Sequence, residues 1–246
     1  MQLFYTPDHA RVGDVIPYYE NGEFKLFYLK NWNPYFGSDK TYGWHLLTTK
    51  DLIHYESETA IGILGGTGCI IKVEGLYHLY YCVFEDQPQR QYVCHATSTD
   101  LTNWTKYPDE TFGPDESIYL LTDWRDPHVI WNEEEKCWWM ILCAQNQGNT
   151  KRRGCVGLCK SADLHHWTCC EPLYAPQSSM SAYECPDLFY MNGWWYLVFS
   201  QFTDRFQTLY RMSRSCNGPW IRPKTDSFDG RAFYAAKTCS DGEHRY

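Results

Sequence analysis

The stretch NGEFKLFY at residues 21–28 recurs three times along the chain, as EGLYHLYY at 74–81, EEKCWWMIL at 134–142 and NGWWYLVF at 192–199. Each copy is a short turn followed by alternating aromatic and aliphatic residues, which is typical of a β-strand. The copies lie 53, 61 and 57 residues apart when they are aligned on their aromatic anchors, Phe24, Tyr77, Trp138 and Trp195. A period in this range predicts the blades of a β-propeller.

A second repeat runs in phase with the first and closes each unit. It reads TTKDLIHY at 48–55, TSTDLTNW at 97–104, KSADLHHW at 160–167 and SRSCNGPW at 213–220. No stretch between the repeats shows a helical period. The sequence therefore predicts an all-β fold, with four blades at about residues 8–57, 58–107, 118–170 and 178–223.

The last residues, GRAFYAAKTCSDGEHRY at 230–246, read as the beginning of another unit. Residues 234–237 are expected to form an inner strand, and the chain stops at Tyr246, where a second strand should start. We therefore expect a single domain over residues 1–246, a five-bladed β-propeller truncated in its fifth blade (228–246), with MQLFY (1–5) as a candidate outer strand. Open strand edges attract other strands, so self-association or a complementing fragment is expected at this blade.

Composition limits the classes of partner. The formal net charge is −8, from 22 basic and 30 acidic residues, and no long basic run is present, so nucleic-acid binding is not expected. No apolar stretch reaches the length of about 18 residues that a membrane span needs, and the first residues lack the pattern of a secretion signal. The 12 cysteines lie in strand-like segments. We therefore expect free thiols and a cytoplasmic location.

Three acidic residues occupy matching places in three of the repeats. Asp14 lies 10 residues before its aromatic anchor, Asp126 lies 12 before and Glu184 lies 11 before. Equivalent strand starts converge on one axis in a radial repeat, so the three carboxylates are expected to meet. Thr67 takes the matching place in the second repeat, and Tyr234 lies near it in the last. The acids show no metal-ligand spacing, so neither a metal nor a cofactor is expected, and they suit acid/base and nucleophilic chemistry on an acetal.

Two motifs carry a family resemblance. WRDPHV at 124–129 and YECPDLF at 183–189 lie one blade apart, and together with the propeller repeat they resemble the Arg-Asp-Pro and Glu-Cys motifs of glycoside hydrolase family 32. That family holds invertases, levanases and other β-fructosidases, and it is related to families 43 and 68. The resemblance covers essentially the whole chain. It implies a five-bladed propeller that hydrolyses a terminal furanosyl unit, here expected to be β-fructofuranosyl, of an oligosaccharide or small glycoside.

The resemblance also implies a role for each acid. Asp14 stands at the place of the family's nucleophile, Glu184 at that of the general acid/base, and Asp126 at that of the residue that stabilises the transition state. Such a set matches a retaining mechanism. Gly13 before Asp14 and Val15 after it differ from the family's usual Asn and Pro-Asn-Gly, which indicates a divergent branch.

Other positions are expected to bind substrate. Arg125 would reach sugar oxygens or pair with an acid, and Thr67 would let the sugar approach the acids. Trp44 and His45 stand near the place of a Trp-Gly pair that lines the family's sugar pocket, with core packing as the alternative for both. Tyr234 would close the pocket from the last repeat.

Two other functions fit the same fold. An inverting arabinosidase or xylosidase of the family 43 type would use the same three acids, with Asp14 as the base. A non-catalytic sugar-binding or scaffold propeller would use none of these acids, although the presence of all three argues against this function. Phosphorolysis would require a cluster of basic residues at the axis, and none is evident.

Overall fold

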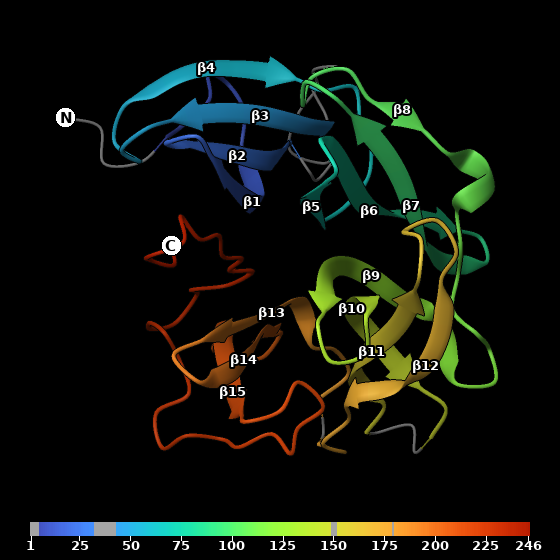
Figure 1. Ribbon diagram of the computed structural model, residues 1–246. Coiled ribbons are helices and arrows are strands. Elements are labelled where there is room, and N and C mark those ends of the chain that lie inside the picture. The colour runs from blue at the N-terminus through green and yellow to red at the C-terminus, as the bar shows by residue number, and fades with distance from the viewer. Residues whose placement is uncertain (1–4, 32–42, 149–151, 179) are drawn as a thin grey trace.

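Figure 1 shows the computed structural model of the chain, which describes residues 5–31, 43–148, 152–178 and 180–246. Four antiparallel sheets stand around a common centre like the blades of a propeller. Within the described ranges the one helical element is a 3₁₀ turn, η2, at Pro108–Glu110. The prediction of an all-β propeller is therefore confirmed.

Three of the blades are four-stranded, and in each the strands pair in the order of the chain. Blade one contains β1 (Val12–Glu20), β2 (Glu23–Lys30), β3 (Gly43–Thr49) and β4 (Tyr55–Ala60). Blade two contains β5 (Gly68–Val73), β6 (Leu76–Asp86), β7 (Gln89–Ser98) and β8 (Thr105–Lys106). Blade three contains β9 (Tyr119–Asn132), β10 (Cys137–Asn146), β11 (Gly154–Ser161) and β12 (Thr168–Tyr174).

Blade four has three regular strands, β13 (Glu184–Met191), β14 (Trp194–Gln201) and β15 (Gln207–Ser213). Isolated bridges join Leu209 to Ser227 and Met212 to Ile221, so an irregular segment runs along the outer edge of β15. The chain then turns back, and its last residues lie between blade four and blade one (Figure 1). Residues 234–237, which were expected to form an inner strand, form no regular strand, because the backbone N–H groups of Ala235 and Thr238 donate to side chains of blade four.

Neighbouring blades pack through their sheet faces, which explains why residues 137–144 of β10 are all apolar. Met140 and Leu142 belong to the cluster shared with blade two, whereas Trp139 and Ile141 belong to the cluster shared with blade four. All four side chains are 0% exposed. Because successive side chains of a strand point to opposite faces, a strand buried on both faces requires an unbroken apolar run.

The Asp-Leu corners of the second repeat are architectural. One carboxylate oxygen of Asp51 accepts hydrogen bonds from the backbone N–H groups of the residues two and three positions later, and Asp100 and Asp163 do the same. Each aspartate thus forms the turn that links the third strand of its blade to the fourth.

The first strand of each blade is the innermost, because β1 contacts β5, β5 contacts β9 and β9 contacts β13. This order places the strand starts at the axis, as the repeat predicted. Residues 1–4 of the expected outer strand lie outside the described residues. Tyr5 packs on blade one, where its ring contacts Tyr28 and Tyr55 and its hydroxyl donates to Glu58 at 2.5 Å.

All 12 cysteines lie within the described residues, and all of them are free thiols, as expected. Nine of the twelve are buried and the other three are half-buried. Among the helices of the described ranges, none is long and apolar enough to cross a membrane.

Candidate active site

A cavity of about 900 Å³ opens where the first strands of the blades meet. Asp14, Asp126 and Glu184 all line it, so the structure brings together the three acids that the repeat placed in phase. Arg125, Thr67 and Tyr234, which were also predicted, line the same cavity. The other lining residues are Leu29, Leu64, Gly65, Gly66, Val83, Phe84, Asp86, Cys185, Phe202, Phe206 and Ala235.

Each of the three acids lies at an irregularity in the innermost strand of its blade. The register of β1 shifts between Gly13 and Val15, so Asp14 is the unpaired residue there. The register of β13 shifts between Glu184 and Asp187, and that of β9 shifts across Asp126. A bulge turns the strand locally and re-aims a side chain that would otherwise point into a blade face. These bulges therefore direct the carboxylates toward the axis.

Two of these bulges hold the backbone in a conformation that non-glycine residues rarely adopt. The φ angles of Asp126 and Cys185 are 59° and 48°, and each residue is followed by a proline. In this conformation the backbone N–H of Cys185 donates to Asp126 Oδ2 at 2.9 Å. Cys185 Sγ lies 3.7 Å from that oxygen and 4.0 Å from Asp14 Oδ2, so one residue contacts both aspartates.

Asp14 is held by Thr67, whose Oγ1 donates a hydrogen bond to Asp14 Oδ2. Burial raises the pKa of the Asp14 carboxyl, the hydrogen bond from Thr67 opposes that rise, and the negative charge of Asp126 adds to it. Thr67, which takes the place of the acid in blade two, thus acts on Asp14 of blade one. It supports the carboxylate by hydrogen bonding.

Glu184 is held from two sides. Arg125 Nη2 donates to Glu184 Oε1 at 2.7 Å, and the hydroxyl of Tyr234 donates to Glu184 Oε2. Burial raises the pKa of the Glu184 carboxyl, Arg125 opposes that rise, and the charges of Asp126 and Asp14 add to it. The net direction is upward, which keeps a proton on Glu184 to a higher pH than on an exposed glutamate.

Arg125 is itself fixed by polar neighbours. Its Nη1 donates to Asp123 Oδ1 at 2.5 Å and to Gln91 Oε1 at 3.3 Å, and its Nε lies 3.9 Å from Asp126 Oδ2. The Arg125 side chain is 15% exposed. The expected pairing of Arg125 with an acid is therefore present, and Asp123 and Gln91 keep the guanidinium directed at the cavity wall.

Trp44 and His45, both expected at the sugar pocket, lie elsewhere. Trp44 is 1% exposed in the cluster between blades one and two, and its Nε1 donates to the carbonyl of Gly66 at 3.1 Å. His45 Nδ1 lies 2.9 Å from Glu58 Oε1 on β4. Both residues belong to β3, the third strand of its blade, which is set back from the axis. The structure therefore places them in packing and ion-pair roles, although Trp44 holds a backbone that lines the cavity.

Sequence reasoning missed the aromatic side of the cavity. Phe202 and Phe206 contact each other with ring centroids 4.6 Å apart, and Tyr234 lies 6.4 and 5.9 Å from them. Phe202 is 64% exposed. Both phenylalanines lie between β14 and β15, outside the repeated segments, so the repeat gave no signal for them. An exposed aromatic edge of this kind suits stacking on a sugar ring.

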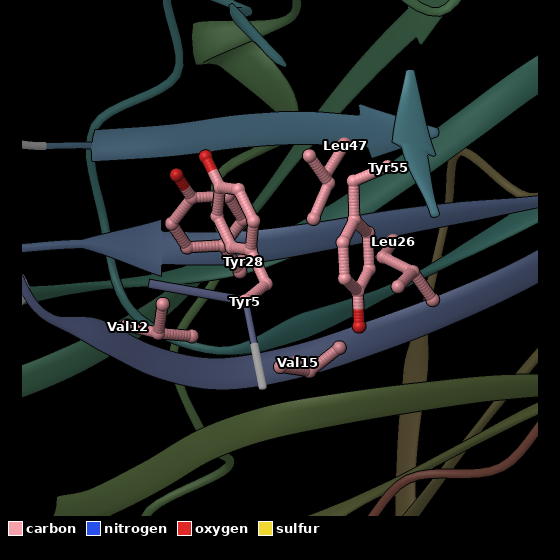
Figure 2. Close-up of a pocket in the computed structure, with 7 residues that line it drawn as sticks. All are labelled: Tyr5, Val12, Val15, Leu26, Tyr28, Leu47 and Tyr55. Atoms are coloured by element: carbon pink, nitrogen blue, oxygen red, sulfur yellow. The ribbon is translucent and has the colours of Figure 1, made fainter. Parts of the chain in front are cut away.

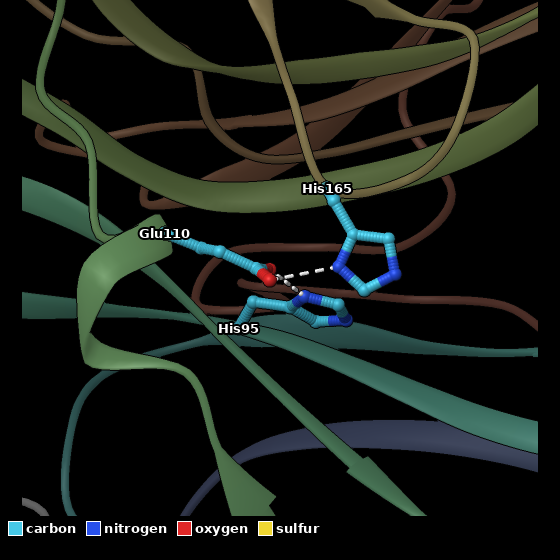
Figure 3. A group of neighbouring side chains, drawn as sticks. All are labelled: His95, Glu110 and His165. Carbon is cyan, nitrogen blue, oxygen red and sulfur yellow. Dashed lines mark hydrogen bonds and ion pairs between the residues drawn. The ribbon is translucent and has the colours of Figure 1, made fainter.

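The described residues contain one group of side chains suited to a metal, and it lies away from this cavity. His95, Glu110 and His165 place their ligand atoms within 4.8 Å of one another (Figure 3). They are 15 and 55 residues apart along the chain. No linear motif reveals such a group, which is why the sequence did not predict it.

The chain matches the family model "Glycosyl hydrolases family 32 N-terminal domain" over residues 15–246. Asp126 and Glu184 lie inside the matched range, and Asp14 lies one residue before it. The chain is 26% identical over 258 residues to the "Levanbiose-producing levanase" of Bacillus subtilis, a match that covers 96% of this chain and 45% of the levanase. It is 30% identical over 174 residues to the "Sucrose-6-phosphate hydrolase" of Escherichia coli, covering 64% of this chain and 34% of that protein.

The chain spans about half the length of the levanases that it matches, 45% and 55%. Among solved structures, it is similar to a Bombyx mori GH32 beta-fructofuranosidase in complex with sucrose, with a TM-score of 0.75 and 23% identity over 95% of this chain and 53% of that one. A thermostable family-43 glycoside hydrolase is similar in fold, with a TM-score of 0.64 and 15% identity over 87% of this chain and 72% of the other. The family match over nearly all of the sequence decides the assignment: the chain belongs to the glycosyl hydrolase family 32 N-terminal domain family.

Proposed function

We propose that this chain forms the catalytic propeller of a β-fructofuranosidase, which removes a terminal fructofuranosyl unit from sucrose or a fructan by a retaining mechanism. The observation that carries the proposal is the meeting of Asp14, Asp126 and Glu184 in one cavity, where burial raises the pKa of two of them. The names of the similar proteins, levanases and sucrose-6-phosphate hydrolases, point to the same sugar.

In the first step the carboxylate of Asp14 attacks the anomeric carbon of the fructosyl unit. Glu184 gives its proton to the glycosidic oxygen, so the bond to that oxygen breaks and the leaving sugar departs as an alcohol. In the second step Glu184 takes a proton from water, and the resulting hydroxide displaces Asp14 from the anomeric carbon. Fructose leaves, Asp14 is again a carboxylate, and Glu184 is again protonated.

Asp126 does not exchange protons in this scheme. Its Oδ2 accepts the N–H of Cys185, and we propose that the carboxylate binds sugar hydroxyl groups and stabilises the positive charge of the transition state. The proposal places the leaving group against Phe202 and Phe206, which form the exposed aromatic edge of the cavity. Arg125 supports this arrangement by orienting Glu184.

A substrate screen with matched variants tests the proposal. The chain is incubated with sucrose, sucrose 6-phosphate, inulin, levan and nitrophenyl pentosides, and the released sugar is identified. We expect fructose release that is abolished in Asp14→Ala, while the circular dichroism spectrum is unchanged. Release of pentose with no release of fructose would favour an arabinosidase or xylosidase, and activity that persists in Asp14→Ala would remove Asp14 from the mechanism.

The stereochemistry of the product tests the retaining step separately. Carboxylates roughly 5 to 5.5 Å apart support retention, whereas a separation of roughly 6.5 to 9.5 Å leaves room for an attacking water and supports inversion. Proton NMR of the first-formed anomer distinguishes the two outcomes. An inverted product would make Asp14 a general base.

We further infer that residues 234–246 begin a fifth blade. Lys237 Nζ donates to the carbonyl of Pro186 at 2.8 Å, and Thr238 donates through both its N–H and its hydroxyl to Asp187 Oδ2 at 2.7 Å. At the far end, the ring of Tyr246 contacts Phe24 on blade one with centroids 4.9 Å apart. The segment thus joins blade four to blade one without forming a regular strand, and it occupies the place that a closing blade would fill.

An apolar face of blade one supports the same inference. A pocket of about 210 Å³ is lined by Tyr5, Val12, Val15, Leu26, Tyr28, Leu47 and Tyr55. Figure 2 shows these seven side chains. Leu26 and Leu47 alternate along their strands with Phe27 and Leu46, which belong to the cluster shared with blade two. The pocket therefore lies on the face turned away from blade two. Val12 and Val15 are each 38% exposed there, and we propose that further strands of blade five cover them.

Those strands would come from additional sequence after residue 246 or from another chain. Light scattering and activity are compared between this chain and a version extended through the missing strands of the blade. We expect self-association and weak catalysis in the short form and a monomeric, more active long form. A short form that is monomeric, stable and equally active would refute the five-blade inference. We also propose, from the 12 free thiols, that the protein works in a reducing, cytoplasmic compartment.

A further inference from the structure

A polar cluster lies at the seam between blade two and blade three. His95 Nδ1 lies 2.6 Å from Glu110 Oε2, and His165 Nδ1 lies 2.8 Å from Glu110 Oε1, so one carboxylate joins two imidazoles (Figure 3). His95 belongs to β7, Glu110 to the 3₁₀ turn η2, and His165 to the corner between β11 and β12. Three separate elements therefore contribute one ligand atom each.

The internal repeat shows what the other seams contain at the same place. His95 lies three residues before the corner Ser98, and the equivalent residues are Leu46 before Thr49 and Leu158 before Ser161. Leu46 and Leu158 are 6% and 5% exposed and belong to apolar clusters. At the seam between blades two and three, an imidazole that is 3% exposed takes the place of this leucine.

The residue that faces His95 from blade three also differs from its equivalent in blade two. The blade-three corner carries His165 where the blade-two corner carries Thr102. Burial of an imidazole and a carboxylate costs free energy that a leucine in the same place would not cost. At this seam, side chains that can bind a metal therefore stand where the other seams have apolar packing. No step of the proposed sugar hydrolysis uses them.

We propose that His95, Glu110 and His165 bind one divalent transition metal ion of the zinc class and that the ion joins blade two to blade three. Two imidazole nitrogens and a carboxylate oxygen are ligands that zinc accepts in proteins, with a fourth place left for water. The side chains of Glu110 and His165 are 20% and 35% exposed, so the cluster has an open side through which an ion can enter.

The geometry requires a small adjustment. Ligand atoms around a tetrahedral zinc ion with bonds of about 2.0–2.1 Å are about 3.3 Å apart, slightly more than the present separations of 2.6 and 2.8 Å. The exposed corner that carries His165 can supply this movement. His95 cannot move far, because its ring is stacked on Tyr80 at 4.6 Å and on Tyr107 at 5.2 Å.

A second residue fixes the orientation of His95. His95 Nε2 lies 3.0 Å from His78 Nδ1 on β6, so it can donate a hydrogen bond while Nδ1 binds the ion. Ligand histidines commonly use their second nitrogen in this way, and loss of the partner weakens metal binding about 10- to 100-fold. His78 is thus a positioning residue for the site.

Isothermal titration of zinc chloride into the chelator-treated chain tests the proposal. We expect one zinc ion per chain, binding at least about tenfold weaker in His165→Gln and about 10- to 100-fold weaker in His78→Gln. His166→Gln is the matched control, because its side chain is the corner neighbour and is 88% exposed. It should bind zinc as the unaltered chain does. Zinc should raise the melting temperature of the unaltered chain and of His166→Gln, but not that of His165→Gln.

The thiol pair Cys159 and Cys169, with sulfurs 3.7 Å apart, could also bind zinc, so Cys169→Ser is titrated in parallel. Zinc binding that is lost in Cys169→Ser and retained in His165→Gln would overturn the proposal. So would equal binding by His165→Gln and His166→Gln, or the absence of stoichiometric binding. If His165→Gln lowers the melting temperature but zinc leaves that of the unaltered chain unchanged, the cluster is a hydrogen-bonded clamp and the metal proposal is wrong.

Discussion

Replacement of Thr67 by valine tests whether its hydroxyl supports the ionised form of Asp14. Thr67 is 3% exposed, and its Oγ1 donates to Asp14 Oδ2. Valine keeps the shape of the side chain and removes the donor. The Asp14 oxygen then loses this hydrogen bond and keeps the contact with Cys185 Sγ at 4.0 Å.

The size of the effect depends on the protonation of Asp14. A hydrogen bond to a charged group contributes about 1.5–3 kcal/mol to stability, and one between neutral groups contributes about 0.5–1.5 kcal/mol. Thr67→Val should therefore lower the free energy of unfolding by about 1 kcal/mol more where Asp14 is ionised than where it is protonated. The cost of the substitution grows as pH rises.

The sign follows from the pKa of Asp14. Burial raises the pKa of Asp14 in the folded state above its unfolded value, and Thr67 opposes the rise. The ionised carboxyl therefore destabilises the fold progressively as pH increases from the unfolded pKa through the folded one. Because valine removes the opposing hydrogen bond, it raises the folded pKa further and steepens this loss of stability.

Urea unfolding of the unaltered chain, Thr67→Val and Thr67→Ser between about pH 4.5 and about pH 8 measures this difference. Serine keeps the donor and loses a methyl group, so its cost should not depend on pH. In an Asp14→Asn background the cost of Thr67→Val should become independent of pH as well. The reasoning is refuted if Thr67→Val costs the same at both ends of the range, or if Thr67→Ser shows the same pH dependence.

Three further predictions concern other parts of the molecule. Glu184→Ala should reduce turnover of sucrose about 10²- to 10⁴-fold and turnover of an activated aryl fructoside much less, because the aryl group leaves without a proton; equal losses would remove Glu184 as the acid. Arg125→Gln should move the alkaline limb of the kcat/KM profile to higher pH, since Arg125 opposes the rise that burial causes in the pKa of Glu184; an unmoved limb would contradict the ion pair's role. Unfolding of the freshly purified chain without reductant should expose 12 reactive thiols, and several protected cysteines would count against a reducing compartment.

The phase of the repeat was sufficient to predict that the acids meet, but the distance of each acid from its anchor also includes the turn after the inner strand. Asp14 and Asp126 both lie five residues before the cross-strand partner of their anchor, Tyr19 and Trp131 respectively. They differ in distance from the anchor because the turn after β1 spans residues 21–22 and the turn after β9 spans residues 133–136. Turn length varies at little cost on the surface, and it accounts for the difference between these two acids. Glu184 differs in another way, because it lies six residues before Tyr190, the cross-strand partner of Trp195.

The incorrect expectation for Trp44 and His45 has a different cause. The sequence identifies both residues as part of a strand, but the face of a third strand depends on how neighbouring blades pack. In the structure Trp44 fills the space between blades one and two, and His45 pairs with Glu58. Contacts between blades join residues far apart in the sequence, so neither these roles nor the cluster of His95 with its partners could be read from local spacing.

The bulges explain how a fold built by repetition obtains a site that is not repeated. A regular inner strand would direct alternate side chains into the two blade faces, where Asp14, Asp126 and Glu184 would be buried without partners. At the bulge in β1 only Asp14 leaves the ladder, whereas in β9 and β13 two residues do, and there Asp126 and Cys185 adopt positive φ. Such strain persists only where surrounding packing enforces it, and the apolar clusters between blades supply that packing. Blade two has Thr67 and no bulge in β5, which fits its role as a hydrogen-bond donor to the acid of blade one.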